Sequence, residues 1–301
     1  MNKSKLTVAL IQASPVLFNK EATIEKTVAL IRQASKKGAE LIVFPESFIP
    51  CYPRGLSFGM YVGGAQADGR DDYKLYYENS VIILDDLGKI SAACKETGCF
   101  VSLGVTEREK DSGTLYCTNI FIDGNGEFVG KHRKIKPTGA ERCIWGEGGA
   151  EDLKTFDTPF GKVGCLICWE NYMPLARTAL YEQGVDIYIA PTADSRKEWQ
   201  STIRHIAQEG RCFVLSCNQF VTRDMYPDSI KTLLDGHLQE ICPGGSCIVS
   251  PTGKYIADGV WHKEEIITAT LDLDLLAAAR LDFDPCGHYS RPDILSLTVT
   301  L

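Results

Sequence analysis

The residue of this 301-residue chain with the clearest capacity for chemistry is Cys168. It follows the apolar run of residues 163–167, whose small and branched side chains are typical of a strand buried on both faces. Trp169, Glu170 and Asn171 come next, and Pro174 opens a predicted helix over residues 174–182. A cysteine between a buried strand and a helix can hold its sulfur rigidly at the rim of a sheet. Cys168 is therefore a candidate thiol nucleophile.

Other interpretations of Cys168 compete with this one. Most free cysteines are small buried hydrophobic residues, and the chain contains 12 cysteines. Cys165 and Cys168 also form a C-x-x-C pair, but Cys165 lies inside the predicted strand, where residues three apart point to opposite faces. No second C-x-x-C pair completes a zinc site, so redox and metal functions have little support.

Charged residues occur at two further places where chemistry is plausible. Glu46 comes just after an apolar run that Pro45 stops, and the basic run of residues 131–136 enters a loop that contains Glu141. Basic runs usually lie in solvent. One lysine of this run could instead turn inward beside the carboxylates, where it would stay charged and offer three donors to a developing anion.

The elements that must position these residues form two similar halves. The first half is expected to contain a strand at 6–13, a helix capped by Asn19 and ended by Gly38, a strand at 41–44, a polar segment at 50–77, a helix at 80–96, a strand at 99–105 and a hairpin with its turn at 124–126. The second half is expected to contain a strand at 163–168, a helix at 174–182, a strand at 187–191, a helix at 199–209, a strand at 212–214, a surface excursion at 222–243 and a hairpin with its turn at 251–253.

This repeat predicts an α/β fold with an internal pseudo-two-fold axis. Residues 37–45 (KGAELIVFP) resemble residues 183–191 (QGVDIYIAP), and the other elements match in the same order. Each half offers an apolar sheet face and amphipathic helices, so the sheets should meet in the middle with helices outside. The strand ends that precede Glu46 and Cys168 could then open on the same side.

Composition limits the functional class. Hydrophobic residues make up 44% and charged residues 24% of the chain, as in ordinary globular proteins. The formal net charge of -7 argues against a nucleic-acid binder, and no apolar run is long enough to span a bilayer. Cysteines scattered without a compact disulfide spacing favour a reducing cytoplasm.

Three ordered motifs resemble the signatures of the nitrilase superfamily. They are FPESF at residues 44–48, RKIKPT at residues 133–138 together with Glu141, and CWEN at residues 168–171. Four further segments, at residues 49–55, 141–146, 205–213 and 287–293, are similar to segments of the nitrilase branch. The resemblance covers nearly the whole chain.

The resemblance implies a fold and an assembly. The fold is a four-layer α-β-β-α sandwich that forms one carbon-nitrogen hydrolase domain over residues 1–301. The assembly is a homodimer or a larger homo-oligomer, in which helices that follow the catalytic cysteine meet their two-fold mates. On that basis Leu175, Ala179 or Leu180 is expected near the interface.

The resemblance also implies roles for four residues. Cys168 would be the nucleophile, Glu46 the general base, Lys134 the stabiliser of the tetrahedral species and Glu141 a second carboxylate that supports the site. These roles suit hydrolysis of an organic nitrile to the acid and ammonia through thioimidate and thioester intermediates, with no metal or organic cofactor. Candidate pocket walls, for which simple packing is an equal alternative, are Tyr52, Trp145, Trp169, Thr192 and Ala193.

Two other functions fit the same motifs. An amidase or carbamoylase of the superfamily would use the same four residues, so only the longer nitrilase-branch segments favour a nitrilase. A non-catalytic binding or scaffold protein would not need all four.

Overall fold

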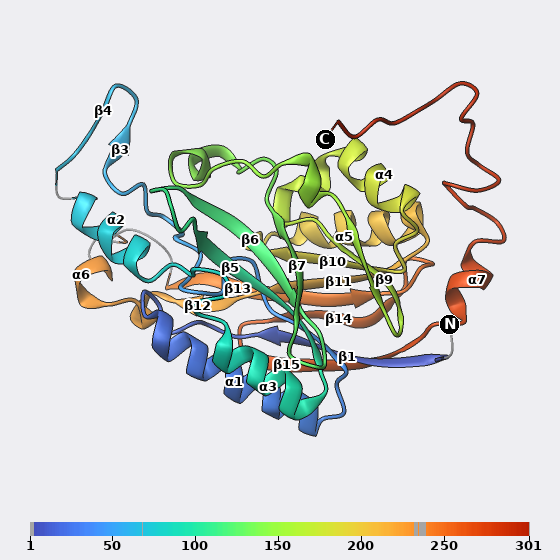
Figure 1. Cartoon of the computed structure of the whole chain (residues 1–301), viewed down its shortest axis with the longest axis horizontal. Coiled ribbons are helices and arrows are strands. Elements are labelled where there is room, and N and C mark those ends of the chain that lie inside the picture. Colours follow the sequence, from blue (N-terminus) through green and yellow to red (C-terminus); the bar gives the residue numbers. More distant parts are fainter. Residues whose placement is uncertain (1–2, 68, 232–233, 235–238, 301) are drawn as a thin grey trace.

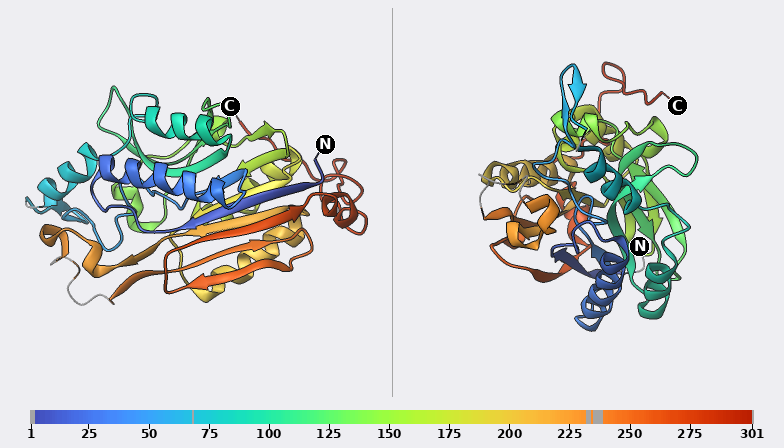
Figure 2. Two further views of the ribbon diagram at one scale, coloured as in Figure 1. Left: turned by 90° about the horizontal axis from the view of Figure 1, so that it is seen from below. Right: turned by 90° about the vertical axis from the view of Figure 1, so that its left-hand side faces the viewer.

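The computed structural model of the chain describes residues 3–67, 69–231, 234 and 239–300. Two β-sheets pack face to face, and helices cover the outer face of each sheet (Figure 1). Figure 2 shows these four layers from two further directions. The predicted α-β-β-α sandwich is therefore confirmed.

The first sheet has the strand order β15-β1-β2-β5-β6-β7. Its strands are β1 (Lys5–Gln12), β2 (Leu41–Val43), β5 (Phe100–Arg108), β6 (Leu115–Ile122), β7 (Phe128–Arg133) and β15 (Glu265–Asp272). Strands β1, β2 and β5 run parallel, whereas β6 and β7 form an antiparallel hairpin at one edge. Strand β15 pairs antiparallel with β1 along its whole length, from Lys5 opposite Asp272 to Gln12 opposite Glu265.

The second sheet repeats this plan. Its order is β12-β13-β11-β10-β9-β8, and β14 also pairs with β13. Its strands are β8 (Thr155–Thr158), β9 (Gly161–Cys165), β10 (Ile187–Thr192), β11 (Phe213–Asn218), β12 (Phe220–Thr222), β13 (Glu240–Val249) and β14 (Tyr255–Trp261). The parallel strands β9, β10 and β11 correspond to β1, β2 and β5, and the β13–β14 hairpin corresponds to β6–β7. The internal repeat is therefore present in the structure.

The helices cover the sheets in pairs. Helices α1 (Lys20–Lys36) and α3 (Gly88–Thr97) pack on the first sheet, and α4 (Pro174–Glu182) and α5 (Lys197–Gly210) pack on the second. Asn19 caps α1 as predicted, because its side chain accepts a hydrogen bond from the Ala22 N–H. The remaining regular elements are α2 (Gly69–Glu78), α6 (Asp228–Lys231), α7 (Leu275–Ala279), and the short strands β3 (Met60–Tyr61) and β4 (Gly64–Ala65).

The core between the sheets is built by alternation along the central strands. On β1, Leu6, Val8 and Leu10 enter the central core, whereas Ala9 and Ile11 pack against the helices. In the second sheet Ile187 and Ile189 lie in the central core, and Tyr188 and Ala190 pack under the outer helices. Both faces of these strands are buried, which explains their nearly continuous apolar sequences.

Three predicted element boundaries are wrong. The helix predicted for residues 80–96 begins only at Gly88, and the preceding polar segment contains α2. The strand predicted to end at Cys168 ends at Cys165. The predicted surface excursion at 222–243 lies partly outside the described residues; within them, Tyr226, Ile230 and Leu234 are buried in the central core, and β13 already begins at Glu240.

Candidate active site

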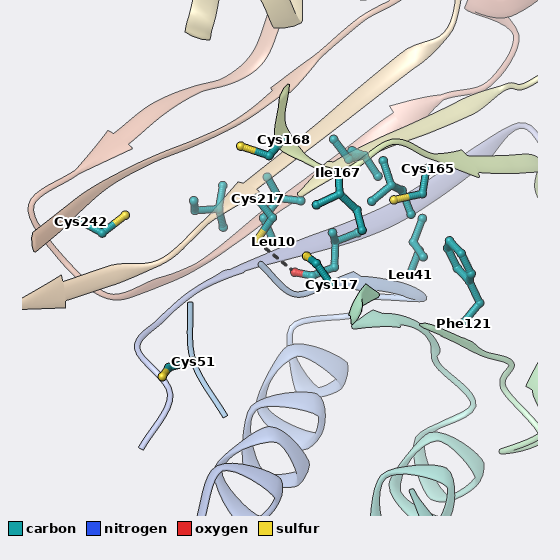
Figure 3. Packing of buried hydrophobic residues seen from close by; sticks show 14 of the residues in the cluster. Leu10, Leu41, Cys51, Cys117, Phe121, Cys165, Ile167, Cys168, Cys217 and Cys242 are labelled. Carbon is teal, nitrogen blue, oxygen red and sulfur yellow. Dashed lines mark hydrogen bonds between the residues drawn. The ribbon is translucent and has the colours of Figure 1, made fainter. Parts of the chain in front are cut away.

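Cys168 lies on a tight turn at the end of β9, at the rim of the second sheet. Leu166 and Ile167 leave the strand, and Cys168 begins the 3-10 helix η3 (Cys168–Tyr172) with φ at 51°. Positive φ is uncommon outside glycine, so the surrounding contacts must hold this conformation. In Figure 3, Cys165 lies among interior side chains such as Leu41, whereas Cys168 lies on the turn beyond Ile167.

The sulfur of Cys168 has a direct partner on the neighbouring strand. The Thr192 hydroxyl, at the end of β10, donates a hydrogen bond to Sγ over 3.1 Å. Because β9 and β10 are parallel neighbours, their carboxyl ends open at the same edge, which brings these two side chains together. The side chain of Cys168 is nonetheless enclosed, since the residue is only 5% exposed.

A buried carboxylate, Glu170, holds this turn to the first half of the chain. Its oxygens accept hydrogen bonds from the Ile167 N–H over 2.6 Å, the Ile135 N–H over 2.6 Å and His132 Nε2 over 2.9 Å. His132 Nδ1 in turn contacts the carbonyl oxygen of Asp152 at 2.8 Å. The motifs did not predict a role for Glu170 or His132, although the sequence has an acidic residue two positions after the cysteine and a histidine in the basic run.

Glu46 lies on a loop that leaves β2 and packs directly on β5. A Cβ atom at Gly104 would lie 2.0 Å from the Pro45 carbonyl oxygen, so this close approach requires glycine. From the second half, Gln219 Nε2 donates to the Glu46 carbonyl over 2.8 Å. The carboxylate itself is fully buried, and its Oε2 atom has no hydrogen-bond partner among the described residues.

Lys134 is the inward lysine of the basic run. Its side chain is fully buried, and Nζ lies 2.7 Å from Glu46 Oε1 and 2.8 Å from Glu141 Oε2. By contrast, Lys131 pairs with Glu107 and the half-exposed Lys136 pairs with Glu147.

Glu141 is fixed by partners on its own loop and on the loop after β2. It lies in the 3-10 helix η1 (Gly139–Cys143), and its Oε2 also accepts the Thr138 N–H over 2.7 Å. Tyr52 donates its hydroxyl to Glu141 Oε1 over 2.7 Å. The carboxylate is thus held from three sides, and its distance from Lys134 is set by backbone as well as by charge.

Burial and neighbouring charges determine the protonation states of Glu46, Cys168 and Lys134. It raises the pKa of Glu46, an effect that the charge of Lys134 only partly offsets. Burial and the Glu46 carboxylate raise the pKa of Cys168 to about 12, against the opposing effects of Lys134 and Thr192. Burial disfavours the ammonium of Lys134, but the surrounding negative groups, Glu46 first, outweigh burial and raise its pKa well above the ordinary value. At neutral pH the resting site therefore holds a thiol and an ammonium ion.

The residues predicted to line the pocket differ in where they lie and in how far they are exposed. Tyr52 lines a cavity of about 380 Å³ together with Arg54, Thr138, Glu141 and Ile144. Trp145 is buried and packs edge-on against Tyr52, with the ring centroids 5.8 Å apart, and Ala193 is buried next to Thr192. The Trp169 side chain is 41% exposed and donates its indole N–H to Asp194 over 2.9 Å, at the surface rather than in the interior.

Residues 3–67, 69–231, 234 and 239–300 contain no group of three or more His, Cys, Asp or Glu residues that could hold a metal ion. None of the helices described there combines the length and apolar character that crossing a bilayer requires.

Comparison with known proteins establishes the family. The carbon-nitrogen hydrolase family matches residues 7–281. The chain belongs to this family. This carbon-nitrogen hydrolase is 45% identical to an aliphatic nitrilase from Sinorhizobium fredii (strain HH103) over 298 residues, which cover 98% of the chain and 96% of that protein. It is 46% identical to nitrilase 2 from Arabidopsis thaliana over 297 residues, covering 96% of the chain and 87% of that protein.

Solved structures agree with this assignment at the level of the fold. The carbon-nitrogen hydrolase from Helicobacter pylori G27 superposes with a TM-score of 0.75 at 22% identity, covering 96% of each chain. An amidase from Nesterenkonia sp. superposes with a TM-score of 0.66 at 16% identity, covering 94% of this chain and 96% of the other. The family match over residues 7–281 and the relatives at about 45% identity confirm the predicted superfamily membership.

Proposed function

We propose that this carbon-nitrogen hydrolase is a nitrilase, which converts an organic nitrile and two water molecules into a carboxylic acid and ammonia. The observation that carries the proposal is the fully buried Lys134 ammonium, which lies between the Glu46 and Glu141 carboxylates. Its charge also acts on the Cys168 thiol and opposes the rise in the pKa of that thiol. Nearly full-length similarity to proteins named nitrilases supports the nitrile over other substrates with a carbon–nitrogen bond.

In the first step Cys168 attacks the nitrile carbon. Because its pKa is raised to about 12, the thiol has to lose its proton as the bond forms rather than beforehand. The unpartnered Oε2 of Glu46 is a suitable acceptor for that proton. The S–C bond forms, the nitrile π electrons move onto nitrogen, and that nitrogen takes up a proton to give a thioimidate. Lys134 and the backbone N–H of Trp169 stabilise the negative charge during this step.

The thioimidate is then hydrolysed in two stages. Glu46 accepts a proton from water, which adds to the thioimidate carbon, and the tetrahedral species expels ammonia to leave a thioester. A second water attacks the thioester, breaks the S–C bond and releases the acid, while the sulfur regains a proton. Glu141 holds Lys134 in place through both stages.

Release of ammonia from a panel of nitriles, matched by the corresponding amides, tests this function. The wild-type protein should release ammonia and the acid from nitriles, and Cys168→Ala should release neither. Turnover of the amides alone would identify an amidase instead, and turnover of neither series would favour a binding protein.

We propose in addition that the protein forms a homodimer through the surface at the start of α4. This surface exposes Trp169, Tyr172, Met173 and Leu175, of which Leu175 is 68% exposed. Ala179 and Leu180 are buried within the protomer, Leu180 in the cluster between the second sheet and its outer helices, so the proposed contact is at Leu175, the exposed member of the three. Light scattering at micromolar concentration should give a dimer, and Leu175→Arg should shift it toward the monomer; an active wild-type monomer would contradict the proposal.

We further propose a reducing cytoplasm as the site of action, because all 12 cysteines are free thiols.

A further inference from the structure

Arg54 lies at the edge of the candidate active site, on the loop between β2 and β3. It is half-buried, and no described carboxylate lies within ion-pair distance of it. Its guanidinium donates to the Ala193 carbonyl oxygen, lies 5.3 Å from the centre of the Tyr52 ring and interacts with the Cys242 thiol. A guanidinium has five N–H donors, so these contacts leave several donors available.

Several other arginines that are at least half-buried have a carboxylate partner, although the half-buried Arg108 instead lies over the Tyr77 ring and donates to the Tyr77 carbonyl oxygen. Arg133 pairs with Glu107, and Arg177 pairs with Glu209 over 2.7 Å. A cation withdrawn from water without an anion is unfavourable, so an arginine at such a place usually has a partner. For Arg54 that partner is absent from the described residues, which makes a bound molecule a natural source of the anion.

The position of Arg54 ties it to the reacting groups. Ala193, which accepts its hydrogen bond, directly follows Thr192, the residue bonded to the Cys168 sulfur. Tyr52, against which it packs, donates to Glu141. Arg54 and Glu141 also line the same cavity of about 380 Å³, a size suited to a small molecule.

Lys134 cannot take over the binding of a substrate anion. Its ammonium already lies between two carboxylates, Glu46 and Glu141, within 2.8 Å of each. An anion in the cavity would meet the repulsion of Glu141 unless a second cation offset it. Arg54 is the cation in the cavity wall that has no carboxylate of its own among the described residues.

We propose that Arg54 binds a carboxylate of the substrate, so that the preferred nitriles carry a carboxylate group a few atoms from the nitrile carbon. This inference rests on the proposed nitrilase function. The planar guanidinium matches a carboxylate with two parallel hydrogen bonds, which fixes the orientation of the substrate as well as its charge.

The test compares two nitriles of the same shape. One is 3-cyanopropanoate, and the other, 4-methylpentanenitrile, has an isopropyl group in place of the carboxylate. The wild-type enzyme should have a kcat/KM for 3-cyanopropanoate at least tenfold above that for the neutral nitrile. Arg54→Gln should lower kcat/KM for the anionic nitrile by about 100-fold and leave the neutral nitrile within about threefold. The kcat/KM of Arg54→Lys for the anionic nitrile should lie between those of the wild type and Arg54→Gln, because lysine keeps the positive charge but cannot form two parallel hydrogen bonds to a carboxylate.

Arg142→Gln is the matched control. Arg142 follows Glu141 directly but is exposed, so its replacement removes one positive charge near the same cavity without removing a buried donor. This variant should keep the wild-type preference. Equal loss of both activities in Arg54→Gln would show a purely structural arginine and overturn the inference, as would a wild-type preference for the neutral nitrile, which needs no variant to fold. With either result the wild-type enzyme still hydrolyses nitriles, so the proposed function stands. Failure of the wild-type enzyme to hydrolyse any nitrile would instead refute the proposed function.

Discussion

In each half of the molecule, a carboxylate accepts a backbone hydrogen bond at the end of the first strand, but the surroundings of the two carboxylates differ. At the end of β9 in the second half, the Ile167 N–H is held by Glu170, which also binds Ile135 and His132 of the first half. At the end of β1 in the first half, the Ser14 N–H and hydroxyl are held by Glu264 of the second half, over 2.7 and 2.9 Å. Each half thus contributes a carboxylate-anchored strand end next to the hairpin of the other half.

The difference between the two ends is burial. Near Glu170, Lys134 is fully buried between two carboxylates, whereas near Glu264 the side chain of Lys263 is 61% exposed. Glu264 itself is partly exposed and also pairs with Lys26. The internal repeat therefore gives two strand ends of similar construction, but only the end near Glu170 has its charged groups buried away from water. Electrostatic interactions are strong only at that end.

The largest effect should come from the nucleophile. We expect Cys168→Ala to fold normally and to lose at least about 10³-fold in kcat, because no other thiol lies on that turn. Cys165→Ala, on the strand three residues earlier, should keep most of the activity. Mass spectrometry with a slow substrate should show an adduct on the peptide that contains Cys168. Similar losses in both variants would contradict the assignment.

The next largest effect should come from the buried lysine. Lys134→Met should lower kcat by about 10²- to 10³-fold, the usual result of removing a donor to a developing anion. Lys136→Met and Lys263→Met, at exposed positions of the two halves, should stay within about twofold. Steady-state kinetics of the three variants would show whether the buried lysine contributes more to kcat than the two exposed lysines. Equal effects would mean that burial does not distinguish them.

The anchoring carboxylates offer a direct comparison between the halves. Glu170→Gln leaves buried N–H donors without an acceptor and should cost roughly 2–4 kcal/mol of unfolding free energy. It should also reduce kcat by about 10- to 100-fold, because the nucleophile turn moves. Glu264→Gln should cost less than about 1 kcal/mol and leave kcat unchanged. Urea denaturation and kinetics below the unfolding transition measure both; equal costs would show that the two anchors are interchangeable.

The smallest effect concerns pH. Burial lowers the pKa of His132, but Glu170 outweighs it, so the pKa in the folded protein is raised above 6.5. The folded state then binds the proton more tightly than the unfolded state. The resulting stabilisation is complete below pH 6.5 and is lost as pH rises through the raised pKa. The melting temperature should therefore fall over that range in the wild type and fall less in His132→Gln. An unchanged slope in the variant would exclude His132 as the source.

Local patterns in the sequence predicted most of the helices and strands. Helix α4 begins at Pro174 and ends at Glu182 as predicted, because proline at the first turn and a glycine after the last fix both ends. Helix α2 was missed, since only Gly69 and Tyr76 within it are buried and most of its residues are polar, charged or tyrosine. The early start predicted for α3 reflects the apolar residues 81–84, where Val81 instead bridges to β5.

Contacts between distant segments could not be predicted. Glu170 and His132 are separated by 38 positions, and Arg54 and Ala193 by 139. No spacing rule relates such pairs; their proximity depends on how the two sheets meet. The inward direction of Lys134 within a run of five basic residues likewise depends on the carboxylates that the fold places beside it.

The distribution of the cysteines has a practical consequence for handling the protein. Only Cys143 and Cys286 are exposed, whereas Cys168 is enclosed and protonated at rest. A thiol-directed reagent, or oxygen during storage, should therefore modify these two positions well before it reaches the nucleophile. Replacing both by serine would give a preparation in which slow alkylation reports on Cys168, and in which protection by a bound substrate could be followed directly.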